Sequence, residues 1–202
     1  MNRIKPEDQI AYYKEHPPKC VDSFLTKPTW LDHIQFDGHG SSGRYPDDLT
    51  PNLNIVFAIT CQCGASNHSV VAEFDHYDIK HYENPVFAVK YHLECSSCYS
   101  RYLFFEPSLH GYNAETFWME GLSLSDYIEQ NVSSSKKEKI TCECSNCKNS
   151  SFEVFARFEY AADLFDEPSF EGKEQDMFSW FTGIGRCSTC SLVNTFIDYE
   201  SA

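Results

Sequence analysis

The chain is patterned mainly as short runs in which apolar and polar residues alternate. Such runs include NIVFAIT at 54–60, SVVAEFDHY at 69–77 and FEVFARFEY at 152–160. The last run places five residues on one face: Phe152, Val154, Ala156, Phe158 and Tyr160. Alternation with a period of two is typical of β-strands that bury one face. The pattern therefore predicts a mainly β fold.

Helical patterns are few. PEDQIAYYKEH begins with Pro6 and acidic residues, which suit a helix start, and Pro17 and Pro18 end it. SLSDYIEQNV at 123–132 predicts a second short helix, with a serine as its cap. We therefore expect a small α+β fold that is mainly β, preceded by an N-terminal helical and loop segment.

The cysteines carry the strongest chemical signal. Nine of the ten fall into four tight clusters: Cys61 and Cys63; Cys95 and Cys98; Cys142, Cys144 and Cys147; Cys187 and Cys190. A pair of cysteines on a tight turn directs two thiolates at one metal ion, and a second pair from a distant hairpin completes a tetrahedral site. Four such turns in one chain predict two structural Zn²⁺ ions.

Two other uses of clustered cysteines are weaker interpretations. Disulfides within a CxC or CxxC pair form strained rings, and the N-terminal stretch has no apolar core that would indicate a signal peptide. A redox CxxC motif needs one reactive pair beside a βαβ pattern, whereas here the pairs form a matched set. Structural zinc accounts for the spacing best.

The two halves of the chain repeat each other. ITCQC at 59–63 reappears as ITCEC at 140–144, and CSSC at 95–98 reappears as CSTC at 187–190. Matching the two ITC segments aligns Cys61 and Cys63 with Cys142 and Cys144. Matching the strands that follow instead makes Cys144 and Cys147 the pair, which we favour because CxxC is the commoner turn. Cys142 remains an alternative ligand.

The repeat divides the chain into four parts. We expect an N-terminal helix and loop arm over 1–54, a zinc-ribbon-like unit over 55–132, a linker over 133–139 and a second zinc-ribbon-like unit over 140–202. The linker is assigned because SSSKKEK is polar and lacks apolar residues. Each unit reads strand, cysteine turn, strand, strand, cysteine turn, strand, and the second carries about eleven more residues between its turns.

Charge limits the partners. The chain has 16 basic and 30 acidic residues among 202, a net charge of −14. This balance disfavours nucleic acid, whose binding depends on neutralising phosphates. No apolar run approaches the roughly 18 residues of a membrane span. We therefore expect no membrane partner and a location in the cytoplasm, a compartment in which thiols stay reduced.

The acidic residues gather in the second unit. Residues 153–176 hold eight carboxylates against Arg157 and Lys173. Acidic residues beside aromatic ones suit a basic protein partner. The candidate contact residues are Asp163, Phe165, Asp166, Glu167, Phe170, Glu171 and Trp180.

The first unit also carries a resemblance. CQCG at 61–64, CSSC at 95–98, LFFE at 103–106 and His110-Gly111-Tyr112 together resemble small bacterial zinc-ribbon proteins of unknown function. The resemblance implies a zinc-stabilised β fold and no established activity. It covers about residues 54–115, and Asn113 stands where the family has an acidic residue.

Together these features predict a non-enzymatic, zinc-stabilised protein-interaction module. An acidic immunity or inhibitor-type protein that binds a basic partner fits best, and a small-molecule substrate is not expected. The alternatives are a nucleic-acid-associated zinc ribbon and a metal-dependent enzyme. An enzyme is disfavoured because catalytic zinc keeps an open position, whereas four cysteines close each site.

Overall fold

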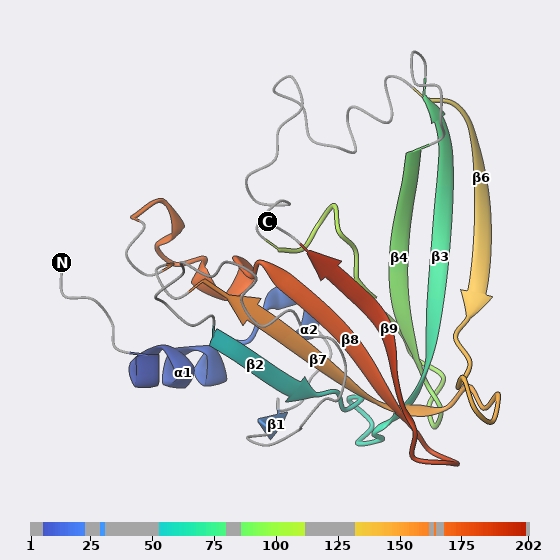
Figure 1. The fold of residues 1–202 in the computed structure, drawn as a ribbon, viewed down its shortest axis with the longest axis horizontal. Coiled ribbons are helices and arrows are strands. Elements are labelled where there is room, and N and C mark those ends of the chain that lie inside the picture. Colours follow the sequence, from blue (N-terminus) through green and yellow to red (C-terminus); the bar gives the residue numbers. More distant parts are fainter. Residues whose placement is uncertain are drawn as a thin grey trace.

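The computed structural model describes residues 6–22, 29–30, 53–79, 86–111, 132–161, 164 and 168–200. Within these residues, nine strands form one antiparallel sheet, accompanied by a few short helices (Figure 1). The prediction of a mainly β fold is confirmed. No helix in the described part of the chain is long and apolar enough to cross a membrane.

Each unit contributes four strands in the same order. The first unit holds β2 (Leu53–Ala58), β3 (Asn67–Ile79), β4 (Val86–Cys95) and β5 (Arg101–Phe105). The second holds β6 (Val132–Thr141), β7 (Phe152–Tyr160), β8 (Trp180–Cys187) and β9 (Val193–Glu200). A two-residue strand, β1 (Thr29–Trp30), pairs with β2. The predicted order of strands and cysteine turns is therefore present twice.

The two units exchange their first strands. β2 pairs with β7 of the second unit, and β6 pairs with β3 of the first. One half of the sheet thus runs β6-β3-β4-β5, and the other runs β1-β2-β7-β8-β9. The registers correspond, because Ala58 faces Phe155 as Thr141 faces Val71. Each half of the sheet therefore contains a strand from the other unit.

The halves meet where β3 and β7 begin. His68 faces Phe152 there, and Asn67 faces Glu153. His68 lies five residues after Cys63, and Phe152 lies five residues after Cys147. Since equivalent residues face each other across antiparallel strands, an approximate twofold axis passes between them.

The prediction of a linker over 133–139 is wrong. These residues form most of β6, which pairs with β3 along nearly its whole length. Their side chains are exposed, as expected of an edge strand, and polar, lysine-rich sequences are common on such edges because they discourage pairing with other chains. The predicted boundaries at 55–132 and 140–202 therefore do not separate two independent sheets.

Aromatic side chains fill the core between the two halves. Phe105 of β5 stacks on Phe181 of β8, with ring centroids 4.2 Å apart, and Phe181 also contacts Phe104 and Phe158. All five residues predicted to share one face of 152–160 are buried. The alternation of that run is thus confirmed as the inner face of β7.

The N-terminal segment packs against the long connection between β7 and β8. Helix α1 (Pro6–Glu15) confirms the predicted helix, and a second turn, α2 (Lys19–Asp22), follows it. The described part of the connection includes the 3₁₀ turns η2 (Pro168–Phe170) and η3 (Glu174–Asp176). The helix predicted over 123–132 lies outside the described residues, apart from Val132 at the start of β6. Residues 36–52, whose Gly, Ser, Asp and Pro content predicts a loop, also lie outside them.

Stacking, hydrogen bonds and an ion pair hold the N-terminal segment there. Tyr13 stacks on Tyr160 with ring centroids 3.9 Å apart. The Tyr12 hydroxyl donates a hydrogen bond to the Gln175 side-chain oxygen over 2.9 Å. Lys19 Nζ lies 2.8 Å from the buried carboxylate of Asp176. The extra residues between the cysteine turns of the second unit thus form part of the surface against which the N-terminal segment packs.

Candidate metal centres

The first centre lies at the end of β3 and β4 where the cysteine turns gather. One turn, between β2 and β3, carries Cys61 and Cys63, and the other, between β4 and β5, carries Cys95 and Cys98. The Sγ atoms of Cys61 and Cys98 are 3.5 Å apart, and those of Cys63 and Cys95 are 3.6 Å apart. All four sulfurs lie within 4.8 Å of one another.

The second centre repeats this geometry. Cys144 Sγ lies 3.5 Å from Cys190 Sγ, and Cys147 Sγ lies 3.5 Å from Cys187 Sγ. Cys142 is not in the group. Its backbone N–H instead donates to the Val70 carbonyl over 2.8 Å, which extends the pairing of β6 with β3. The structure therefore brings together the eight cysteines favoured by the sequence and leaves Cys142 outside.

The sulfur separations match a four-coordinate metal. A disulfide requires about 2.05 Å between sulfurs, far less than the 3.5–3.6 Å found here. Four sulfurs placed tetrahedrally at Zn–S distances of about 2.3 Å are roughly 3.8 Å apart. All ten cysteines are free thiols. Each group can thus close around one ion without further ligands.

Backbone geometry shapes all four cysteine turns in the same way. The residue after the second cysteine has a positive φ: Gly64 (89°), Tyr99 (60°), Lys148 (60°) and Ser191 (60°). Its N–H donates to the carbonyl of the first cysteine, over 2.8–3.0 Å: Gly64 to Cys61, Tyr99 to Cys95, Lys148 to Cys144 and Ser191 to Cys187. Only Gly64 adopts this backbone without a steric penalty, so three turns hold an ordinary residue under strain.

Four side chains that were not predicted from the sequence contact the sulfurs: Ser100, Tyr102, Asn149 and Asn194. The Tyr102 hydroxyl lies 3.3 Å from Cys61 Sγ, and Asn194 Nδ2 lies 3.7 Å from Cys144 Sγ. Tyr102 and Asn194 are each the fourth residue after the last cysteine of their centre. The spacing alone identifies them once the repeat is aligned. Hydrogen bonds of this kind orient metal ligands and tune their basicity.

One thiol in each centre, Cys98 or Cys187, has a pKa well below that of a free cysteine. Hydrogen bonds from the Ser100 side chain and backbone lower the pKa of Cys98 to about 6. Burial opposes ionisation of Cys187, but the backbone N–H groups of Cys190 and Thr189 lower its pKa to about 6. Each centre therefore offers a thiolate at neutral pH, the form that binds a metal.

A second thiol in each centre, Cys63 or Cys147, has a raised pKa. A backbone hydrogen bond from Ala65 favours the Cys63 thiolate, but the sulfurs of Cys61 and Cys98 raise the pKa of Cys63 to about 12. Cys147 behaves alike: the Asn149 backbone favours its thiolate, while desolvation and the neighbouring sulfurs raise its pKa to about 12. Four sulfurs this close cannot all ionise unless a cation is present.

Of the seven predicted partner-binding residues, three lie in the described part of the chain. Asp163, Phe165, Asp166 and Glu167 are outside the described residues. Phe170 packs against the core, and Trp180 Nε1 donates to Asp198 over 2.5 Å. Glu171 is exposed.

Several other acidic residues of 153–176 form internal ion pairs. Glu153 pairs with Arg186 and Glu159 with Arg157. Among the described acidic residues of this stretch, Glu171 alone is exposed. In the described part of the stretch, these two carboxylates are thus paired within the chain.

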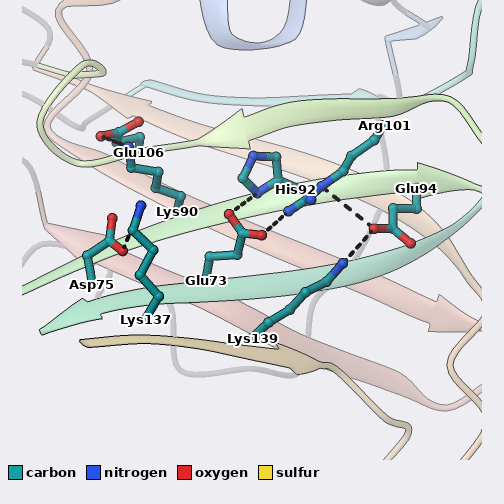
Figure 2. Close-up of polar contacts among 9 residues, drawn as sticks. All are labelled: Glu73, Asp75, Lys90, His92, Glu94, Arg101, Glu106, Lys137 and Lys139. Carbon is teal, nitrogen blue, oxygen red and sulfur yellow. Dashed lines mark hydrogen bonds and ion pairs between the residues drawn. The ribbon is translucent and has the colours of Figure 1, made fainter. Parts of the chain in front are cut away.

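A network of opposite charges covers the outer face of β6-β3-β4-β5 (Figure 2). Arg101 binds Glu73 and lies 3.6 Å from Glu94. Lys139 reaches Glu94 over 3.2 Å, and Lys137 lies 3.6 Å from the buried carboxylate of Asp75. These lysines belong to the only basic cluster of the sequence. Both lysines therefore lie within ion-pair distance of acids on the same sheet.

The HGY motif closes a turn after β5. His110 Nδ1 accepts a hydrogen bond from the Glu106 backbone N–H over 2.9 Å, and burial lowers the pKa of this histidine. Gly111 has a φ of 89°, a conformation that favours glycine. Tyr112 lies outside the described residues. The described part of the motif thus has a conformational role.

The chain matches no protein family, curated protein or solved structure. The resemblance of the first unit to bacterial zinc-ribbon proteins therefore stays a prediction.

Proposed function

We propose that the protein is a non-enzymatic interaction module whose fold is stabilised by two structural Zn²⁺ ions. The main support for metal binding is the set of four sulfurs in each centre, which all lie within 4.8 Å of one another. Four thiolates suit zinc, and they leave no open position for a substrate or an activated water. The hydrogen bonds from Tyr102 and Asn194 support the ligand sets from outside.

Metal analysis of the purified chain tests this assignment. We expect two zinc ions per chain and a cooperative loss of β structure when a strong chelator removes them. Circular dichroism and tryptophan fluorescence report the unfolding. Cys142→Ser is the matched control, because Cys142 lies outside both groups and should leave the metal content at two. A chain that binds no zinc, or that keeps its stability after chelation, refutes the proposal.

The partner that we propose is a basic protein. The support is the net charge of −14, together with the acids that lie within ion-pair distance of Lys137 and Lys139. Electrostatic attraction of this kind weakens as salt screens it.

A pull-down with the zinc-loaded chain, treated with nuclease, tests the class of partner. We expect a retained basic protein that is released at high salt. Loss of all retained material on nuclease treatment would favour the alternative, a nucleic-acid-associated zinc ribbon. A metal-dependent enzyme is the remaining alternative, and no side-chain arrangement described above favours it.

A further inference from the structure

We infer that the two metal centres load as one coupled unit, so that an ion at either centre raises the affinity of the other. This inference rests on the proposed zinc binding and goes beyond it. It follows from where each cysteine turn sits relative to the exchanged strands.

Each centre takes one of its turns from the point at which the chain crosses between the halves of the sheet. The turn with Cys61 and Cys63 joins β2, which pairs with β7, to β3, which pairs with β4. The turn with Cys144 and Cys147 joins β6, which pairs with β3, to β7, which pairs with β8. The other turn of each centre joins two strands of a single half. An ion at either centre therefore ties both halves together.

Releasing one ion would loosen the strand on which the other centre depends. Without an ion at the first centre, β2 loses the anchor that follows it. β2 contributes Ile55 and Phe57 to the core and pairs with β7 from Leu53↔Tyr160 to Ala58↔Phe155. β7 begins five residues after Cys147. By the approximate twofold axis, the same holds for β6, β3 and the first centre.

The centres are also linked directly through the backbone. Cys95, His68, Phe152 and Cys187 form one row across β4, β3, β7 and β8, and all four are buried. Beside this row, Ser96 N–H donates to the Asn67 carbonyl, and Ser188 N–H donates to the Ser151 carbonyl, each over 3.0 Å. Three strand spacings of about 4.8 Å place the Cα atoms of Cys95 and Cys187, one ligand of each centre, roughly 14 Å apart.

Independent loading would suit two separate ribbons, each with its first strand paired inside its own unit. Among the described residues, no strand pairing joins β2 to β3 or β6 to β7. An ion that orders the cysteine turn at one crossing therefore also orders the strands that hold the cysteines of the other centre. Coupling between sites of this kind typically changes affinity about 5–150-fold, and the change is reciprocal.

Native mass spectrometry of the full metal-free chain, with zinc added at one ion per chain, tests the inference without any substitution. We expect chains with no ion and chains with two ions, with the one-ion species in the minority. Independent equal centres would leave about half of the chains with one ion, and that result would overturn the coupling. A chain that takes up no zinc would overturn the proposed function as well, so the two failures are distinguishable.

Two matched double variants measure the coupling. Cys95→Ser with Cys98→Ser removes the first centre, and Cys187→Ser with Cys190→Ser removes the second. We expect the surviving centre in each to bind zinc about 5–150-fold more weakly than in the intact chain, by the same factor, in competition with a chelator. Wild-type affinity at the surviving centre overturns the inference. If a variant does not fold, the species distribution of the intact chain decides.

Discussion

Gly185 of β8 gives the most direct test of the packing beside the second centre. A Cβ at this position would lie 2.3 Å from Cε2 of Phe196 and 3.0 Å from Cβ of Phe152. Carbon atoms pack best at about 3.5–4.0 Å, so Gly185→Ala forces the Phe196 ring to retreat by roughly 1 Å. That ring packs edge-on against Phe152, with centroids 4.6 Å apart.

The magnitude follows from these contacts. Overpacking a core costs about 1–3 kcal/mol, and disturbing an aromatic pair adds about 0.5–1.5 kcal/mol. Replacing glycine lowers the entropy of the unfolded chain and returns about 0.4–1 kcal/mol. We expect Gly185→Ala to destabilise the protein by about 1–3 kcal/mol. With a urea m-value of about 1–3 kcal/mol/M, the midpoint falls by roughly 1 M.

The assay is urea unfolding of the zinc-loaded protein, with the metal content measured in the same samples. The control is a double-mutant cycle with Phe196→Ala, which removes the clashing ring. In that background Gly185→Ala should cost much less stability. An unchanged midpoint for Gly185→Ala, or equal costs with and without the Phe196 ring, would refute this account of the packing.

Three further outcomes are expected. Tyr99→Gly relieves the left-handed backbone after Cys98 and should raise stability by about 0.5–1 kcal/mol, seen as a higher melting temperature; a lower one would show that no strain is relieved. Zinc affinity should fall as the pH is lowered, and more steeply below about pH 6, where Cys98 and Cys187 also take up protons that the metal must displace; chelator competition between pH 5 and 8 measures this, and a flat profile contradicts it. Phe181→Ala empties the centre of the core and should cost about 3–5 kcal/mol in urea unfolding, whereas a cost below 1 kcal/mol would place Phe181 outside the core.

The cysteine turns were predictable because their geometry is local. A pair of cysteines two or three residues apart defines its own turn, and the repeat supplies the partner turn. The ambiguity among Cys142, Cys144 and Cys147 was resolved only by pairing: Cys142 continues the ladder of β6, so the turn begins after it. The alternation of 152–160 was equally readable, since one face of β7 lies in the core.

The strand exchange was not predictable from local pattern. β6 is paired with a strand of the other unit, and its exposed side chains carry no apolar alternation to mark it as a strand. Composition alone therefore indicated a linker. Two carboxylates of the acidic stretch are paired within the sheet: Glu153 faces Arg186 across β7 and β8, which only the register reveals, and Glu159 pairs with Arg157, two residues earlier on β7.

The exchange also sets an order of events during synthesis. β2 leaves the ribosome about a hundred residues before β7, the strand that it pairs with. At about 5–20 residues per second, Ile55 and Phe57 wait roughly 5–20 s without their partners. The nascent first half therefore exposes an apolar strand that its own unit cannot cover. We expect this window to be when the chain is most prone to aggregation and most dependent on chaperones.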